Sequence, residues 1–394
     1  MERVDVQALV PAFGAGIAAV LAVIAIMKAS NAVFRRRSKP SRGSATVKLR
    51  AADAPGARSP EQQRVSWTVS KPNHLGEDDE DITIVRAIPV FDEGDVSVDG
   101  AMALDATANS ETPASRVHLL YEEDAEAEEV TAASARILLY ATGDSDRGRV
   151  RARNEDSVLV MPERSLFAVA DGMGGHRGGE IASSLAIDTL EDAFSRSAFD
   201  GQIESDESVP RRARELASAV QMTNECVHAM AVADRALSGM GTTLVAARFS
   251  PNKQRLYVGH VGDSRCYRLR RGTIRQLTTD HTMASLGMKG PHAKDLYQAV
   301  GVNDRLVIDL IVDKPQDGDV YLLCSDGLSK MLSDNEIREV LVEQEDLEGA
   351  LYTLIEMAND RGGNDNVTIV IVKVLDRVSK KALESMTQNA LFSA

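Results

Sequence analysis

The richest chemical signal in the sequence is Asp171, which ends an apolar run at residues 166–170. Glycines follow the aspartate closely, at positions 172, 174, 175, 178 and 179. A carboxylate at the end of a buried strand suits a hard metal ion, and glycines let backbone carbonyls and water approach it closely. Aspartate is also common in tight turns, so this segment alone leaves a plain strand-to-helix turn open.

Acids stand at the ends of several other apolar runs. Asp326 follows residues 320–324, Asp365 precedes 367–374, and Asp263 follows 255–261. Glu155 and Asp156 precede a further short run. Carboxylates that converge from several strand ends repel one another unless cations neutralise them. An all-oxygen ligand set indicates Mg²⁺ or Mn²⁺ rather than zinc.

The order of these motifs resembles the metal-dependent protein phosphatases of type 2C, and the form DGMGGH resembles their bacterial branch. The resemblance covers residues 136–375. The matching segments are 151–156 (RARNED), 167–176 (FAVADGMGGH), 239–243 (GMGTT), 262–265 (GDSR), 279–282 (TDHT), 324–327 (CSDG) and 363–368 (GNDNVT).

The resemblance implies a role for each acid. Asp171 is expected to bridge two Mn²⁺ or Mg²⁺ ions that activate a water molecule for attack on a phosphate ester. Asp326 and Asp365 would complete one metal, and Glu155 and the Gly172 carbonyl the other.

Three further residues take lesser or separate roles by the same resemblance. Asp156 would orient the metal shell, and Asp263 matches a weaker third metal site, although a structural role in its turn is nearly as well supported. Arg151 matches an arginine that grips two phosphate oxygens through its planar guanidinium.

The sequence also departs from the family pattern at two places. Met173 stands where some members carry a histidine proposed as the general acid, and His176 three residues later is expected to be a loop residue instead. The flap region, residues 283–300, is short, which leaves substrate selectivity and occupancy of the third metal site open.

The pattern of strands and helices that position these residues predicts a mixed α+β domain. Hairpins such as residues 267–277, turning at Arg271–Gly272, favour antiparallel pairing. Strands are expected at residues 157–161, 166–170, 242–249, 255–261, 266–269, 306–312, 320–324 and 367–374, and helices at 179–194, 211–237, 333 onward and 347–359. The resemblance implies a four-layer sandwich of two antiparallel sheets flanked by helices.

Residues 6–27 form an uncharged apolar run of 22 residues, long enough to cross a bilayer as a helix. Eight Lys or Arg and no acid follow in residues 28–50, which predicts a single-pass span in the cytoplasmic membrane with the catalytic domain in the cytoplasm. A cleaved signal peptide would carry its positive charge before the apolar run. A buried core helix is the alternative.

Residues 51–135 read as an acidic, disordered linker, and residues 376–394 as a C-terminal tail. From residue 77 to 129 there are 17 acids and two bases, a net charge of −15 against −14 for the whole chain. Such a segment repels itself and extends. It is either a solvated tether or a docking site for a basic partner. The three cysteines have no metal-ligand spacing and indicate a reducing compartment.

These patterns predict a membrane-anchored Ser/Thr protein phosphatase with a monomeric catalytic domain. Its expected partners are phosphorylated proteins, a Ser/Thr kinase and the membrane, but no nucleic acid. Three alternatives stay open: a pseudophosphatase that binds phosphoproteins without turnover, a relative that acts on an anti-sigma-factor antagonist, and a tether whose acidic linker recruits partners.

Overall fold

The computed structural model describes residues 66–70, 116–122, 125, 132–175, 177–195, 209–344 and 346–377. The predicted membrane span, the basic segment that follows it and His176 lie outside these ranges, as do most of the predicted linker and nearly all of the predicted tail. Among the described residues, no helix combines the length and apolar character that crossing a membrane requires.

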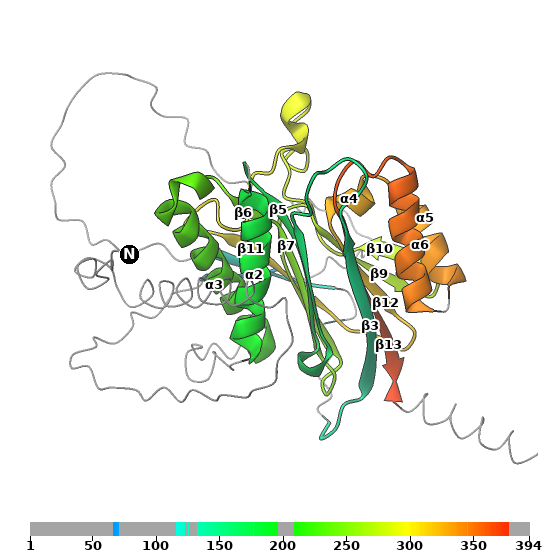
Figure 1. The fold of residues 1–394 in the computed structure, drawn as a ribbon. Coiled ribbons are helices and arrows are strands. Elements are labelled where there is room, and N and C mark those ends of the chain that lie inside the picture. The colour runs from blue at the N-terminus through cyan, green and yellow to red at the C-terminus, as the bar shows by residue number, and fades with distance from the viewer. Residues whose placement is uncertain are drawn as a thin grey trace, which may run out of the picture.

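Two β-sheets face each other in the middle of the molecule, with helices on both outer faces (Figure 1). The first sheet has eight strands. They follow the order β1 (Ser66–Ser70), β2 (Arg116–Tyr121), β11 (Val307–Asp313), β8 (Arg255–Val261), β7 (Leu244–Ser250), β5 (Leu166–Met173) and β4 (Asp156–Met161), with the short β6 (Gly241–Thr242) beside β5.

The second sheet has five strands, all paired antiparallel. They follow the order β10 (Thr273–Gln276), β9 (Arg265–Arg270), β12 (Val320–Cys324), β13 (Val367–Asp376) and β3 (Ile137–Asp146). The predicted hairpin turn between β9 and β10 is confirmed: Arg271 and Gly272 have φ of 51° and 77°, the left-handed conformation of a tight turn.

The helices form the two outer layers (Figure 1). Those over the first sheet are α2 (Gly178–Ser195) and α3 (Arg211–Ala233), and those over the second are α4 (Asp326–Ser329), α5 (Asp334–Glu343) and α6 (Leu347–Asp360). The remaining turns of helix are η3 (Pro162–Arg164), η4 (Arg235–Leu237) and η5 (Pro291–Lys294). The helix expected over residues 211–237 therefore ends at Ala233, and its last residues form η4.

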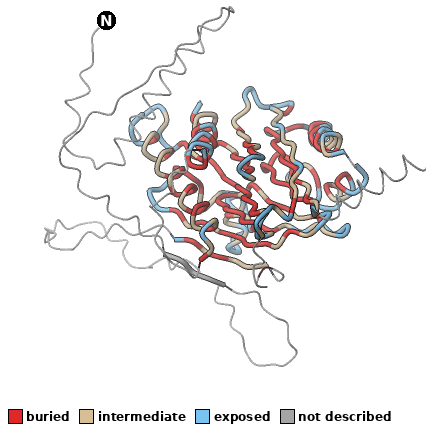
Figure 2. The backbone as a smooth tube through the Cα atoms, turned by 90° about the horizontal axis from the view of Figure 1, so that it is seen from below, coloured by how far each residue is buried: buried red, intermediate tan, exposed pale blue. Residues whose placement is uncertain are grey.

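Hydrophobic residues pack in three layers, one between the sheets and one under each outer layer of helices. Phe249 lies edge-on to both Phe167 and Tyr321 between the sheets, with ring centroids 5.9 and 5.4 Å away. Every residue of β7 and β8 is buried, and Figure 2 shows that the buried residues run through the middle of the molecule. The predicted four-layer sandwich of two sheets and flanking helices is confirmed.

Two expectations are wrong at residues 116–122. These residues do not belong to a disordered linker, and the sheet that they join is not purely antiparallel. Instead β2 pairs parallel with β11, and β1 pairs parallel with β2. Val117 and Leu119 are fully buried, so burial of alternate apolar side chains explains why this short run orders within an acidic segment.

Candidate active site

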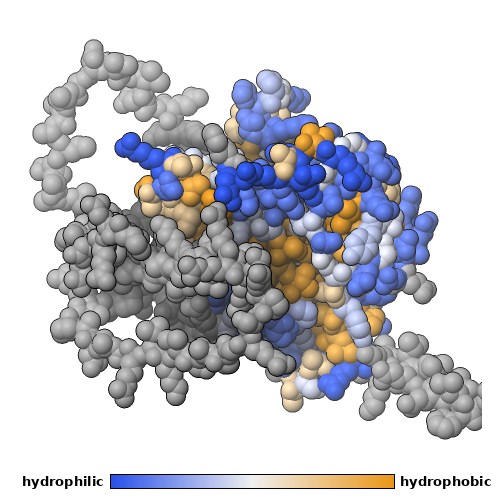
Figure 3. All heavy atoms as spheres, in the orientation of Figure 1, coloured by the Kyte–Doolittle hydropathy of each residue, from blue (hydrophilic) through white to orange (hydrophobic). Residues whose placement is uncertain are grey.

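The predicted acids come together at one end of the sandwich, where β5, β6 and α4 meet at the top of Figure 1. Asp171 lies near the end of β5 and pairs in register with Asp156 at the start of β4. From the second sheet, Asp326 follows β12 and opens α4, and Asp365 directly precedes Asn366 and β13. The surface at this end is largely hydrophilic (Figure 3).

Close backbone packing brings these strand ends together. A Cβ on Gly172 would lie 2.1 Å from the Gly179 carbonyl oxygen and 2.5 Å from that of Glu155. A Cβ on Gly327 would lie 1.9 Å from the carbonyl oxygen of Asn366. A side chain at either glycine would therefore force apart the segments that carry the acids.

Asp171 lies at the electrostatic centre of the cluster. Burial raises the pKa of its carboxyl well above the ordinary value, and the charges of the four surrounding aspartates raise it further. Those four are Asp156, Asp326, Asp263 and Asp365. Without a cation, this group of carboxylates is destabilised by mutual repulsion.

Asp326 has one buried carboxylate oxygen, Oδ1, without a hydrogen-bond partner. Its other oxygen, Oδ2, pairs with the Lys330 ammonium one helical turn later. An unpartnered buried carboxylate oxygen is costly unless a cation binds it. This orphaned atom and the crowding around Asp171 therefore fit the predicted binding of divalent metal ions.

Asp156 is buried deeply and is held from the second sheet. The Thr368 hydroxyl donates a hydrogen bond to its Oδ2 at 2.6 Å. Burial raises the pKa of Asp156 to about 6, because the hydrogen bond from Thr368 only partly offsets the loss of solvation. The arrangement agrees with the expected role of Asp156, which is to orient the metal ligands.

Arg151 lies at the open side of the cluster with its side chain about half exposed (46 %). Its Nη2 donates to Asp365 Oδ2 at 2.7 Å, and its Nη1 lies 3.7 Å from Glu155 Oε2. The two acids hold the guanidinium at the cluster while part of it faces solvent. That position suits binding of phosphate oxygens.

Asn366 is a positioning residue for which the sequence suggested no role. Its Oδ1 accepts from the Glu155 backbone N–H at 2.9 Å. Its Nδ2 donates to the carbonyls of Arg147 and Arg153, at 2.8 and 2.9 Å. One side chain thus makes three hydrogen bonds to the loop that carries Arg151 and Glu155.

Thr243 links Asp171 to the turn at the end of β8. Its Oγ1 accepts from the Asp171 backbone N–H at 3.1 Å and lies 2.7 Å from Ser264 Oγ. The turn formed by residues 262–264, called the β8 turn below, carries Asp263. Burial, together with the charge of Asp326, raises the pKa of Asp263 to about 6. Asp263 therefore belongs electrostatically to the acid cluster.

The flap projects beyond the end of the sandwich and contains η5, drawn in yellow at the top of Figure 1. Its base is tied down by antiparallel bridges that join Thr282 to Leu296 and Thr242 to Val300. Leu286 and Met288 at its tip are exposed, at 45 % and 43 %. Met173 ends β5 beside Gly241, and its side chain carries no exchangeable proton.

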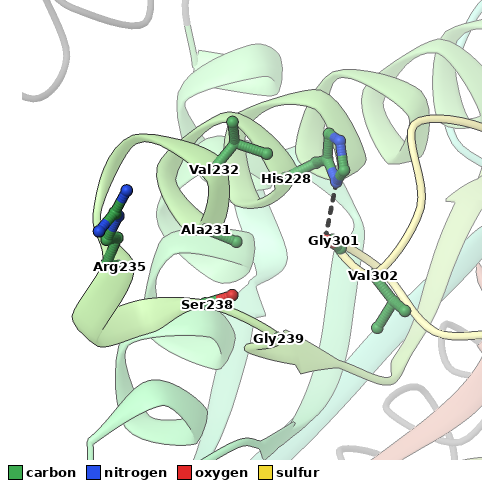
Figure 4. Close-up of a pocket in the computed structure, with 8 residues that line it drawn as sticks. All are labelled: His228, Ala231, Val232, Arg235, Ser238, Gly239, Gly301 and Val302. Atoms are coloured by element: carbon green, nitrogen blue, oxygen red, sulfur yellow. Dashed lines mark hydrogen bonds between the residues drawn. The ribbon is translucent and has the colours of Figure 1, made fainter.

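A pocket of about 230 Å³ lies between the end of α3, η4 and the loop at Gly301 and Val302 (Figure 4). His228 Nδ1 lies 3.1 Å from the Gly301 carbonyl oxygen at its edge. The pocket includes none of the predicted site residues. Its wall is nevertheless close to the site, because a Cβ on Gly241 of β6 would lie 2.8 Å from Val302 Cγ2.

Comparison with known proteins identifies the family. Residues 143–369 match the family described as protein phosphatase 2C. The serine/threonine phosphatase stp of Listeria welshimeri is 35 % identical over 249 residues, which cover 60 % of this chain and 96 % of that protein. The serine/threonine protein phosphatase PstP of Mycobacterium tuberculosis is 40 % identical over 250 residues, which span 61 % of this chain and 46 % of PstP.

Solved structures agree with both sequence and fold. The catalytic domain of PstP in complex with two manganese ions is 38 % identical, with a TM-score of 0.52, and the match covers 61 % of this chain and all of that domain. PppA, described as a regulatory component of the type VI secretion system in Pseudomonas aeruginosa, is 34 % identical with a TM-score of 0.53, covering 60 % of this chain and 98 % of PppA.

Proposed function

This chain belongs to the protein phosphatase 2C family and is a metal-dependent serine/threonine protein phosphatase, and from that premise we propose that it acts at the cytoplasmic face of a membrane. There it reverses phosphorylation by a Ser/Thr kinase. The observation that carries the catalytic part is the convergence of four aspartates on Asp171, with an unpartnered buried oxygen on Asp326 and with Arg151 beside the cluster.

The carboxylates divide the metal binding between them. Asp171 would hold both ions, Asp326 and Asp365 would complete one of them, and Glu155 with the Gly172 carbonyl would complete the other. When bound, two Mn²⁺ or Mg²⁺ ions supply a water molecule of lowered pKa and neutralise charge on the phosphate. Asp263 adds a ligand for a weaker third ion.

The protein's own side chains align the substrate. The guanidinium of Arg151 binds two phosphate oxygens through parallel N–H donors and presents the ester for in-line attack. Asp365 holds the side chain of Arg151, and Asn366 holds its loop, so both are already ordered before the phosphate binds. Met173 cannot protonate the leaving alcohol, so the proton would come from a metal-bound water or from another group.

Metal removal tests the catalytic proposal. We expect the full chain to hydrolyse a phosphothreonine peptide with Mn²⁺ or Mg²⁺ present, and to lose that activity in excess EDTA. Inhibitors of the okadaic type should have no effect. Undiminished turnover in excess chelator would exclude the two-metal mechanism.

The membrane part rests on charge asymmetry in the sequence. Eight positive residues follow the apolar run at 6–27, and Arg3 alone precedes it. Each Lys or Arg near an anionic leaflet contributes about 1 kcal/mol of attraction, which favours residues 28–50 on the cytoplasmic side. The kinase and phosphoprotein targets would then lie beneath the same bilayer.

Thiol labelling tests this topology. A cysteine introduced at position 45 should resist an impermeant thiol reagent in intact cells and react after lysis. A cysteine introduced at position 3 is the matched control and should react in intact cells. The reverse pattern would place the catalytic domain outside the cytoplasm and refute the proposal.

A further inference from the structure

The strand β2 lies outside the family match, which begins at residue 143, yet it is built into the catalytic sheet. Its backbone is anchored at both ends: the Arg116 N–H donates to the Leu306 carbonyl at 3.1 Å, and the Glu122 N–H donates to the Val312 carbonyl at 2.9 Å. Its buried residues, Val117 and Leu119, belong to the core beneath α2 and α3. This strand is therefore part of the folded phosphatase unit.

The side chain of His118 in β2 begins a chain of hydrogen-bonded side chains. The register places His118 beside Asp309 of β11, and His118 Nδ1 lies 3.2 Å from Asp309 Oδ1. The other oxygen of Asp309, Oδ2, lies 3.1 Å from His281 Nε2. Both oxygens of this carboxylate are thus engaged, one by the added strand and one by the phosphatase core.

His281 in turn makes two hydrogen bonds to Gly262, the first residue of the β8 turn. Its backbone N–H donates to the Gly262 carbonyl at 2.7 Å, and its Nδ1 accepts from the Gly262 N–H at 3.1 Å. Because Nδ1 accepts, Nε2 carries the proton and donates it to Asp309. Gly262 has φ of 108°, which strains any other residue. Asp263 of the acid cluster follows directly.

The same histidine reaches the base of the flap. Gln298 Nε2 lies 3.1 Å from His281 Nδ1. The side-chain oxygen of Gln298, Oε1, accepts from the Val307 N–H at 2.9 Å. The Tyr297 N–H donates to the His281 carbonyl at 3.1 Å. The ring of His281 is therefore fixed between the flap and β11.

This group also includes His260, whose ring lies 4.6 Å from that of His281. The ligand atoms of His260, His281 and Asp309 lie within 4.8 Å of one another, a spacing that a metal ion could use. However, both ring nitrogens of His281 and both oxygens of Asp309 already have hydrogen-bond partners. His281 and Asp309 are therefore satisfied within a hydrogen-bond chain, whereas the two buried ring nitrogens of His260 have no hydrogen-bond partner.

We propose that β2 is a positioning strand for the catalytic centre, in which His118 acts through Asp309 and His281 on the β8 turn. The inference rests on the phosphatase activity of this catalytic centre. It adds to that centre a positioning residue, His118, which lies outside the family match. Loss of the His118 contact frees Asp309, loosens the ring of His281, and lets Asp263 leave the position that binds metal.

The test compares variants of the full chain in detergent. His118→Ala removes the contact, His118→Asn retains an amide donor near the position of Nδ1, and Arg116→Ala changes an exposed residue of the same strand. Calorimetry gives the half-saturating Mn²⁺ concentration, hydrogen exchange follows the Gly262 amide, and the melting temperature reports stability. The wild type must first show Mn²⁺-dependent activity, and its absence would refute the proposed function rather than this inference.

We expect His118→Ala to raise the half-saturating Mn²⁺ concentration about threefold to tenfold, the usual worth of one hydrogen bond. Exchange of the Gly262 amide should speed up. His118→Asn should restore both values toward those of the wild type, and Arg116→Ala should change neither. If His118→Ala alters the melting temperature alone, with Mn²⁺ binding and Gly262 exchange unchanged, β2 is merely structural and the proposal is wrong.

Discussion

Four other aspartates surround Asp171, and we therefore expect metal binding to depend on this side chain most. Asp171→Asn keeps the shape of the side chain and removes its charge. We expect kcat on a phosphothreonine peptide to fall on the order of a thousandfold or more, since the bridging ligand is lost. The melting temperature of the metal-free chain should not fall, because removal of the charge relieves repulsion. Near-normal turnover would contradict the assignment.

Metal binding should depend on pH through Asp156 and Asp263, whose pKa values are each raised to about 6. Above that pH both groups are ionised and ready to bind a cation, and below it a metal ion must displace their protons. Mn²⁺ affinity should therefore fall as pH drops from 7 through 6 to 5. Calorimetry in two buffers of different ionisation enthalpy would measure the protons released. Equal affinity at pH 7 and pH 5 would show that these carboxylates do not face the metal.

At the scale of the elements, the loop of residues 147–155 makes three hydrogen bonds with a single side chain, that of Asn366. Asn366→Ala removes three hydrogen bonds to that loop and leaves the Glu155 N–H without its acceptor. We expect kcat/KM to fall on the order of tenfold to a hundredfold, because one net hydrogen bond is worth about 1 kcal/mol and several are lost.

Asn364→Ala is the matched control for this change. Asn364 lies two residues before Asn366, and its Nδ2 contacts a weak acceptor, the Met331 sulfur, at 4.0 Å. Steady-state kinetics of both variants separate a specific role from general loosening of the loop. Equal losses in the two variants would refute the role assigned to Asn366.

Much of this arrangement could be predicted from the sequence, because strand-end acids and glycines are local patterns. The strands that end or begin near Asp171, Asp326 and Asp365 agree with the sequence prediction to within three residues. The role of Asn366 could not be predicted, because its partners lie more than 200 residues away in the chain. The strand β2 was hidden by the acids around it, and its partner β11 follows it by almost 190 residues.

At the scale of the whole molecule, β2 makes the folded unit begin before residue 136. We expect a chain that starts at residue 132 to be less stable than one that starts at residue 110. The shorter chain loses Val117 and Leu119, and burial of each is worth about 2 kcal/mol. Thermal unfolding of the metal-loaded proteins should show a fall in Tm on the order of 10 °C. Identical melting curves would show that β2 contributes nothing to stability.

The parallel pairing of β2 with β11 also bears on how the protein behaves in a crowded solution. A bare strand at the margin of a sheet offers a row of unpaired N–H and C=O groups to any other chain, and is a template for aggregation. By pairing β11 with β2 and β2 with β1, this chain moves the open edge of the sheet to β1, a strand of only five residues, which offers few such groups. A protein kept at high local density would thereby gain solubility from residues that contribute no ligand to its catalytic centre.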